Sequence, residues 1–255
     1  MRTPLPGPAL VLGLLLAAPS WAMPEESATR SAERGAEDYA TRFAALVADY
    51  DAALEAFYEA TAALPEDAAP EDVPQHPAET FHPRFRRLAK AGSIDAAFWC
   101  LNSGRAGVFG DFVELLGLAV SGAPGDERLG VVLSGLHKQV PGPSAELLEV
   151  LDAYAASAPG DELGYAALRA KGTVLTMDPS DADGMEEGLA LLEGLLELDA
   201  SFPGKGGIPG QVFRLKNLAV GMMAPDWTAT DIDGQPIALS DYRGKVTVLD
   251  FWGFW

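Results

Sequence analysis

KVTVLDFWGFW, residues 245–255, is the stretch that decides which fold the C-terminal part of the chain adopts. β-Branched and aromatic residues follow one another from Val246 to Trp252, with Asp250 as the one charged residue among them. Such a run is typical of a fully buried strand in a sheet. We therefore predict a core strand in this position.

The residues that precede this strand contain signals for a hairpin and a turn. WTATDIDGQPIAL, residues 227–239, has two short β-like runs on either side of Asp233-Gly234, a dipeptide that favours tight hairpin turns. LSDYRGK, residues 239–245, is typical of a single helical turn that ends at a glycine, Gly244. A hairpin, a turn and a core strand in this order predict the opening of an α/β unit.

Further toward the N-terminus, residues 37–210 have the pattern of an all-α domain. Apolar side chains recur there at spacings of three and four, which predicts amphipathic helices. The first stripe consists of Tyr39, Phe43, Leu46, Tyr50, Leu54 and Phe57. Similar patterns predict further helices around Phe85, at 94–101, at 109–120 and at 188–198, with Gly and Pro clusters between them.

A short repeat indicates how these helices are arranged. APGDE occurs at residues 123–127 and again at 158–162, an offset of 35 residues. Each copy follows one predicted helix and opens the next, with Asp126 or Asp161 placed to cap it. This period suits helical hairpins of the tetratricopeptide (TPR) type. A generic helical bundle fits the same observations equally well.

The segments outside these two regions have different characters. Residues 1–22 contain an early Arg2, an apolar run from Ala9 to Ala18 and small residues up to Ala22, the pattern of a secretory signal peptide. That run is too short to cross a bilayer, so we expect an exported chain, periplasmic or extracellular, with no stable membrane span after signal removal. We predict a disordered lead-in at 23–36 and a linker at 211–219.

Charge and composition limit the partners and the chemistry. A formal net charge of −19 disfavours nucleic acid as a partner. The single cysteine, Cys100, lies among Phe98, Trp99 and Leu101, and we expect a buried apolar thiol. His76 and His82 each lie beside a proline in or near a predicted loop, without ligand spacing. We therefore predict no metal and no cofactor.

Residues 220–255 resemble the first part of the thioredoxin-like redoxin family, the thiol–disulfide oxidoreductases of the TlpA and ResA type. The matching pieces are Gly221, Ala224-Pro225-Asp226-Trp227, Asp233-Gly234, Leu239-Ser240-Asp241-Tyr242, Arg243-Gly244-Lys245 and the run from Val246 to Trp252. The resemblance implies a fold of class α plus α/β. A helical N-terminal domain, with hairpins that are TPR-like or generic, would precede the hairpin and core strand of an incomplete thioredoxin-like domain at 220–255.

In this family the strand leads directly into a Cys-x-x-Cys motif, which we expect immediately after Trp255. The resemblance thus implies a chain truncated just before its active site and inactive as it stands. The parent would act on a disulfide-bearing protein or a small-molecule thiol partner. Asp250 would assist proton transfer and Trp252 and Trp255 would flank the thiolate, although an exposed acid and a core aromatic explain Asp250 and Trp252 as well.

Two other functions are compatible with the sequence. One is a peroxidase of the peroxiredoxin (AhpC/TSA) kind, which shares the fold; the Trp-Gly-Phe-Trp run fits the Cys-x-x-Cys class better. The other is a helical-repeat module that binds a protein partner and carries a vestigial redoxin segment. In every case we expect the apolar run at 246–255 to be poorly ordered or aggregation-prone in this chain.

Overall fold

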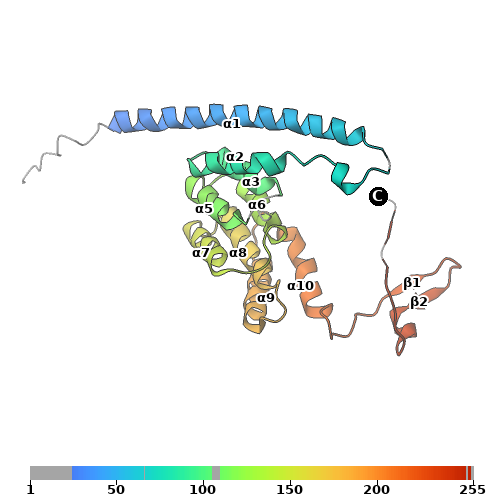
Figure 1. The fold of residues 1–255 in the computed structure, drawn as a ribbon. Coiled ribbons are helices and arrows are strands. Elements are labelled where there is room, and N and C mark those ends of the chain that lie inside the picture. Colours follow the sequence, from blue (N-terminus) through green and yellow to red (C-terminus); the bar gives the residue numbers. More distant parts are fainter. Residues whose placement is uncertain (1–24, 66, 105–109, 251, 254–255) are drawn as a thin grey trace, which may run out of the picture.

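The computed structural model describes residues 25–65, 67–104, 110–250 and 252–253, and helices make up most of this part (Figure 1). The helices are α1 (Glu25–Ala62), α2 (Ala78–Lys90), α3 (Ile94–Asn102), α5 (Phe112–Gly122), α6 (Arg128–Gly135), α7 (Ala145–Ser157), α8 (Glu162–Leu175), α9 (Ala182–Leu196) and α10 (Ile208–Asn217). The 3₁₀ turns are η1 (Pro70–Asp72), η2 (Leu136–Lys138), η3 (Lys205–Gly207) and η4 (Leu239–Tyr242). The strands β1 (Thr228–Thr230) and β2 (Pro236–Ala238) complete the elements.

Helix α1 lies along one side of the helical array and contacts it through the predicted aromatic stripe (Figure 1). The Tyr50 ring meets Phe81 edge to face at 5.5 Å and Trp99 at 5.0 Å. The helix begins at Glu25, inside the segment predicted to be a disordered lead-in. Glu, Ala and Arg are strong helix formers, which accounts for the difference.

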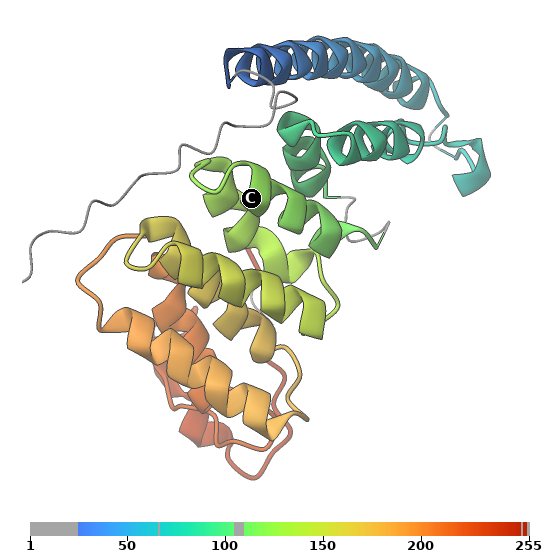
Figure 2. The same cartoon turned by 90° about the vertical axis from the view of Figure 1, so that its left-hand side faces the viewer.

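Helices α2 to α10 form one array, in which α3 contacts α2 and α5, both α6 and α7 contact α8, and α9 contacts α8 and α10 (Figures 1 and 2). The prediction of an α-rich region is therefore confirmed. One continuous core runs from α2 to α8 and buries Phe85, Leu129 and Leu147 almost completely. A second cluster joins α9, the turn after it and α10 through Leu192, Leu195, Phe202 and Ile208. Burial of these apolar side chains supplies most of the stabilisation.

Side chains placed at helix starts explain where several helices begin. Ser93, Ser144, Asp161 and Asp181 each accept a hydrogen bond from a backbone amide in the first turn of α3, α7, α8 and α9. Each APGDE copy lies between two helices. Its alanine caps the C-terminus of the preceding helix, and the backbone dihedrals are similar at Ala123 after α5 (φ −148°, ψ 66°) and at Ala158 after α7 (φ −127°, ψ 56°). The local geometry repeats, and membership of the tetratricopeptide type stays a prediction.

Helix α10 occupies most of the segment predicted to be a linker at 211–219. Ile208 is fully buried, and Val212 and Leu215 pack against the cluster on α9. The apolar spacing of these three residues supports a helix once α9 provides a surface. The linker prediction missed this helix because the first residue of the apolar pattern, Ile208, lies within the Gly- and Pro-rich stretch that ends at Gly210.

The C-terminal segment contains the predicted hairpin and lies apart from the helical array (Figure 1). Strands β1 and β2 pair antiparallel, with Thr228 opposite Ala238 and Thr230 opposite Pro236. Turn η4 follows, and Gly244 has a φ of +79°, as predicted for a turn that closes on glycine. The predicted core strand does not form, and residues 246–250 are exposed without regular structure. A strand requires a neighbouring strand for its backbone hydrogen bonds, and none of the described residues supplies one.

Candidate functional site

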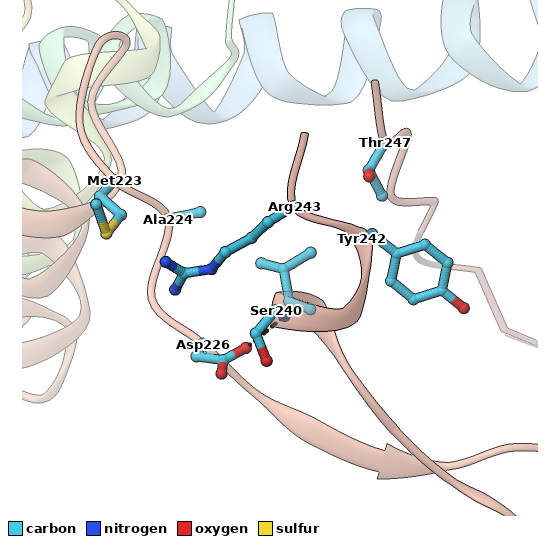
Figure 3. Close-up of a pocket in the computed structure, with 8 residues that line it drawn as sticks. Met223, Ala224, Asp226, Ser240, Tyr242, Arg243 and Thr247 are labelled. Atoms are coloured by element: carbon cyan, nitrogen blue, oxygen red, sulfur yellow. Dashed lines mark hydrogen bonds between the residues drawn. The ribbon is translucent and has the colours of Figure 1, made fainter. Parts of the chain in front are cut away.

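The C-terminal segment folds around a small open hollow, shown in Figure 3. Its volume is about 330 Å³. The lining residues are Met223, Ala224, Asp226, Leu239, Ser240, Tyr242, Arg243 and Thr247. All of them belong to the segment that resembles the redoxins, so the hollow is a feature of this segment alone.

Asp226 connects the loop before β1 to turn η4. Its Oδ1 accepts hydrogen bonds from the backbone amides of Ser240 (2.9 Å) and Trp227 (3.1 Å), and Figure 3 shows the carboxylate directed at Ser240. The Ser240 side chain lowers the pKa of Asp226 most, and backbone hydrogen bonds and the positive charge of Arg243 lower it further. Asp226 therefore fixes the start of the segment against the end of the hairpin.

Two further aspartates shape the hairpin and the turn. Asp231 Oδ1 accepts from the amides of Asp233 (2.9 Å) and Gln235 (2.8 Å), and Gly234 supplies the positive φ of the turn. Asp241 Oδ2 accepts from the amide of Ala238 (2.9 Å) at the start of η4. These local bonds explain how the segment keeps its shape while burying little apolar surface.

Two of the three predicted supporting residues, Asp250 and Trp252, are described by the structure. Asp250 is exposed, and Trp252 is 73% exposed. Trp255 lies outside the described residues. The structure thus leaves the roles of all three as predictions, since those roles require a sheet around them.

Cys100 is buried in the last turn of α3, and the prediction of a buried thiol is confirmed. Burial, together with the negative charge of Asp111, raises the pKa of its thiol to about 12. A thiol with this pKa is protonated at neutral pH and is a poor nucleophile. The chemistry of a thiol–disulfide oxidoreductase therefore does not arise at Cys100.

A buried polar cluster was missed by the sequence reasoning. His82, expected in or near a loop, lies in α2 and is fully buried, 3.9 Å from Asp111 through its Nε2. Arg86 Nε lies 2.9 Å from Asp111 Oδ2 and forms an ion pair with it, but the angles between the two groups do not suit a hydrogen bond. Burial lowers the pKa of His82 and raises that of Asp111. The spacing of His82 and Arg86, one helical turn apart and flanked by Phe81 and Phe85, was the signal available in the sequence.

Metal ligation and membrane crossing were also considered for the described part of the chain. Within it, no three His, Cys, Asp or Glu side chains converge as ligands for a metal ion. No helix there combines the length and the apolar character that a bilayer crossing requires.

Comparison with known proteins gives short local matches to thiol–disulfide oxidoreductases. The chain is 55% identical over 38 residues to the thiol–disulfide oxidoreductase ResA of Geobacillus kaustophilus, and 50% identical over 38 residues to that of Geobacillus thermodenitrificans. It is 37% identical over 46 residues to ResA of Bacillus thuringiensis subsp. konkukian. No family model and no solved structure matches the chain.

These matches cover a small part of this chain and of each relative. They include 15% to 18% of this chain and 22% to 27% of the relatives. The chain thus spans about a quarter of the length of the relatives that it matches. One segment of the chain is similar to thioredoxin-like thiol–disulfide oxidoreductases.

Proposed function

We propose that residues 220–255 are the first part of a thioredoxin-like domain in an exported thiol–disulfide oxidoreductase. The observation that carries this proposal is the identity of 50% to 55% with two ResA proteins over 38 residues. That length is close to the extent of the segment that resembles the redoxins. The hairpin and the turn at Gly244, both found at the predicted positions, support the same assignment.

The reaction requires two cysteines beyond those in the printed sequence, whose single thiol is buried. In the proposed full protein, Val246 to Trp252 become a core strand and a Cys-x-x-Cys follows Trp255. The first thiolate attacks a substrate disulfide, and the second cysteine resolves the mixed disulfide. Asp250, buried in such a sheet, would exchange a proton during resolution. The printed chain by itself would be inactive.

The first experiment is to read the coding sequence beyond the codon for Trp255. A Cys-x-x-Cys at the next position would support the proposal, and its absence would overturn it. The protein that includes the motif is then tested for reduction of insulin disulfides in the presence of dithiothreitol. Replacing the first of the two new cysteines by serine should abolish catalysis of this reduction.

Two variants within the printed chain refine this assay. Cys100→Ser should leave insulin reduction unchanged, because this thiol is buried and protonated. Asp250→Asn should slow the resolution of the mixed disulfide without preventing its formation. Rapid turnover of hydrogen peroxide with little insulin reduction would favour the peroxiredoxin alternative instead.

The helical region supports a second function, the binding of a protein partner. Its stacked helices expose the apolar side chains of Val131 on α6 and Phe213 on α10. We propose that this region presents a partner or substrate to the redox domain after export. Capture of one specific protein by the whole chain, lost in Val131→Asp, would support this function. Capture unaffected by that change would argue against binding through Val131.

A further inference from the structure

A groove between α1 and α2 gathers positive charge on this acidic protein. The two helices lie side by side (Figures 1 and 2), and a hollow of about 420 Å³ lies where they meet. Three arginines line it, Arg42 of α1 and Arg84 and Arg87 of α2, together with one carboxylate, Asp49 of α1. We call this hollow the arginine groove. The formal net charge of the chain is −19, so a local excess of guanidinium groups calls for a physical reason.

Aromatic packing fixes the position of the two helices along each other. Phe43 of α1 meets Phe85 of α2 edge to face at 5.8 Å, and Tyr50 meets Phe81 at 5.5 Å. The later ring on α1 contacts the earlier ring on α2, so the two helices run antiparallel. Arg42, which precedes Phe43, therefore lies toward the C-terminal end of α2.

The two ends of the arginine groove differ in charge. At one end Arg84 Nη2 donates to Asp49 Oδ2 at 3.2 Å, and this ion pair joins α2 to α1. At the other end Arg87, in the last turn of α2, forms no ion pair within the described residues. Arg42 reaches Asp38 of its own helix at 3.4 Å, and both side chains are more than half exposed. Because an exposed pair of this kind contributes little stability, Arg42 can exchange Asp38 for another carboxylate.

The other basic residues of α2 show that carboxylates are available to this helix. Arg86 lies 3.1 Å from Glu114 and 2.9 Å from Asp111, and Lys90 lies 2.6 Å from Glu114. Arg87 follows Arg86 directly and hence lies on a different side of α2. Acidic side chains thus neutralise the neighbours of Arg87, whereas the guanidinium in the arginine groove keeps its charge uncompensated.

Aliphatic side chains form the floor of the arginine groove. Leu46 of α1 and Leu88 of α2 line it and are 8% and 5% exposed, so they lie deeper than the arginines. Ala45 also lines the groove and is exposed, and its small side chain leaves room above the floor. A ligand in this groove therefore meets aliphatic carbon below and guanidinium groups at the rim.

We propose that the arginine groove binds an acidic peptide segment of a partner protein, in which a carboxylate side chain adjoins an aliphatic one. The carboxylate lies between Arg42 and Arg87, since guanidinium groups match the geometry of carboxylate oxygens. The aliphatic side chain packs on Leu46 and Leu88.

Two observations favour a peptide as the occupant. The negative charge of the protein opposes the binding of a free anion, so an aliphatic contact has to add to the affinity, and a peptide carries both groups. Arg42, Ala45 and Arg87 are exposed, so a peptide can cross the groove while its backbone groups stay in water. The groove is separate from Val131 on α6 and from Phe213 on α10, and its test is independent of the redox reaction.

Fluorescence anisotropy of labelled peptides tests this proposal with the 255-residue chain at constant ionic strength. The probe is a hexapeptide of alternating leucine and glutamate. Two matched peptides carry glutamine in place of glutamate, or serine in place of leucine. We expect saturable binding of the probe and at least about threefold weaker binding of each matched peptide, because each lacks one of the two contacts. The proposal is overturned if the probe does not bind saturably up to about 1 mM, or if the glutamine peptide binds equally well.

Variants at exposed positions separate the groove from the net charge of the protein. Ala45→Glu places a carboxylate inside the groove and should weaken binding of the probe at least about tenfold, because like charges meet. Ala44→Glu adds the same charge outside the groove and should leave binding unchanged. Arg42→Gln and Arg87→Gln should each weaken binding about threefold, whereas Arg214→Gln on α10 should have no effect. Equal weakening by Ala44→Glu and Ala45→Glu would overturn the proposal.

A second copy of the chain is the alternative occupant, because the chain itself is rich in acidic residues. Analytical ultracentrifugation without peptide distinguishes the two. We expect no self-association that depends on the groove. Dimers that form in the wild type and are lost in Ala45→Glu, but not in Ala44→Glu, would assign the groove to a second copy and overturn the proposal of a separate partner.

Discussion

The helical region and the C-terminal segment of this chain are stabilised in different ways. From α2 to α10, fully buried leucine, phenylalanine and alanine side chains join successive helices into two clusters. From residue 218 onward no described residue is buried, and the hairpin depends on hydrogen bonds to three aspartates. A helix satisfies its backbone within itself, whereas a strand needs another strand. The first region therefore completes its core within the described chain, and the second does not.

The largest expected loss of stability comes from truncating a buried side chain in the helical core. Phe85 is fully buried, stacks on Trp99 at 3.7 Å and meets Phe43 edge to face at 5.8 Å. Phe85→Ala should lower the free energy of unfolding by about 3–5 kcal/mol, because it removes apolar contact and leaves a cavity. Urea unfolding followed by circular dichroism measures this loss.

Val248→Ala is the matched change in the C-terminal segment. Val248 is 87% exposed, so its truncation should change stability by less than about 0.5 kcal/mol. If Val248→Ala lowered the free energy of unfolding as much as Phe85→Ala does, residues 246–250 would lie inside a packed core. The proposed difference between the two regions would then be wrong.

The next effect concerns the close approach of α8 and α9. A Cβ on Gly188 would lie 2.8 Å from the carbonyl oxygen of Gly172 and 2.9 Å from Cβ of Leu175. Gly188→Ala should therefore cost about 1–3 kcal/mol, since the two helices must separate. Gly194→Ala on the same helix meets open space and should stabilise the chain by about 0.5–1 kcal/mol. If thermal unfolding showed that both substitutions change the melting temperature in the same direction, α8 and α9 would not be tightly packed at Gly188.

A smaller effect follows from the buried His82. Its pKa in the folded chain lies below the ordinary 6.5, because burial disfavours the charged imidazole. As pH falls below 6.5, the unfolded chain takes up a proton that the folded chain excludes, so the free energy of unfolding decreases until the folded pKa is reached. Urea unfolding of the wild type should show this decrease.

His82→Gln tests the assignment of that pH dependence. The variant should lose less stability than the wild type over the same range, although the charged groups of Arg86, Asp111 and Glu79 remain around the site. The C-terminal segment holds no histidine, and therefore NMR signals of the hairpin should not follow this transition. Equal slopes for the wild type and His82→Gln would contradict the role of this side chain.

The comparison also explains what the sequence could predict. Spacing located several helices and the hairpin, because apolar periodicity and Asp233-Gly234 act locally, whereas α10 was predicted as a linker. The strand at 246–252 was predicted from the same local composition, yet strand formation depends on distant partners. The buried His82 and Arg86 come from α2, and Asp111 comes from the residue that precedes α5. Such juxtapositions are set by tertiary packing, which no single stretch of sequence contains.

The smallest expected effect lies within the hairpin itself. Asp226→Asn replaces the carboxylate that accepts from the amides of Ser240 and Trp227 by a neutral, weaker acceptor. Hydrogen exchange at the Ser240 amide should accelerate, whereas the urea midpoint of the helical region should not move. Because its hydrogen bonds hold the pKa of Asp226 below 3.8, the wild-type protection should persist at pH 3.8 and be lost only as pH falls through this lowered pKa.

Asp250→Asn is the control for this last prediction, since it removes the same charge from an exposed carboxylate further along the segment. It should leave exchange at Ser240 unchanged, which would show that the bond to Asp226, and not the local charge, protects this amide. A shift of the urea midpoint in Asp226→Asn would mean that the hairpin and the helices unfold together. The two regions would then form one cooperative unit. Their separation, which rests on the absence of buried residues among those described after residue 218, would be wrong.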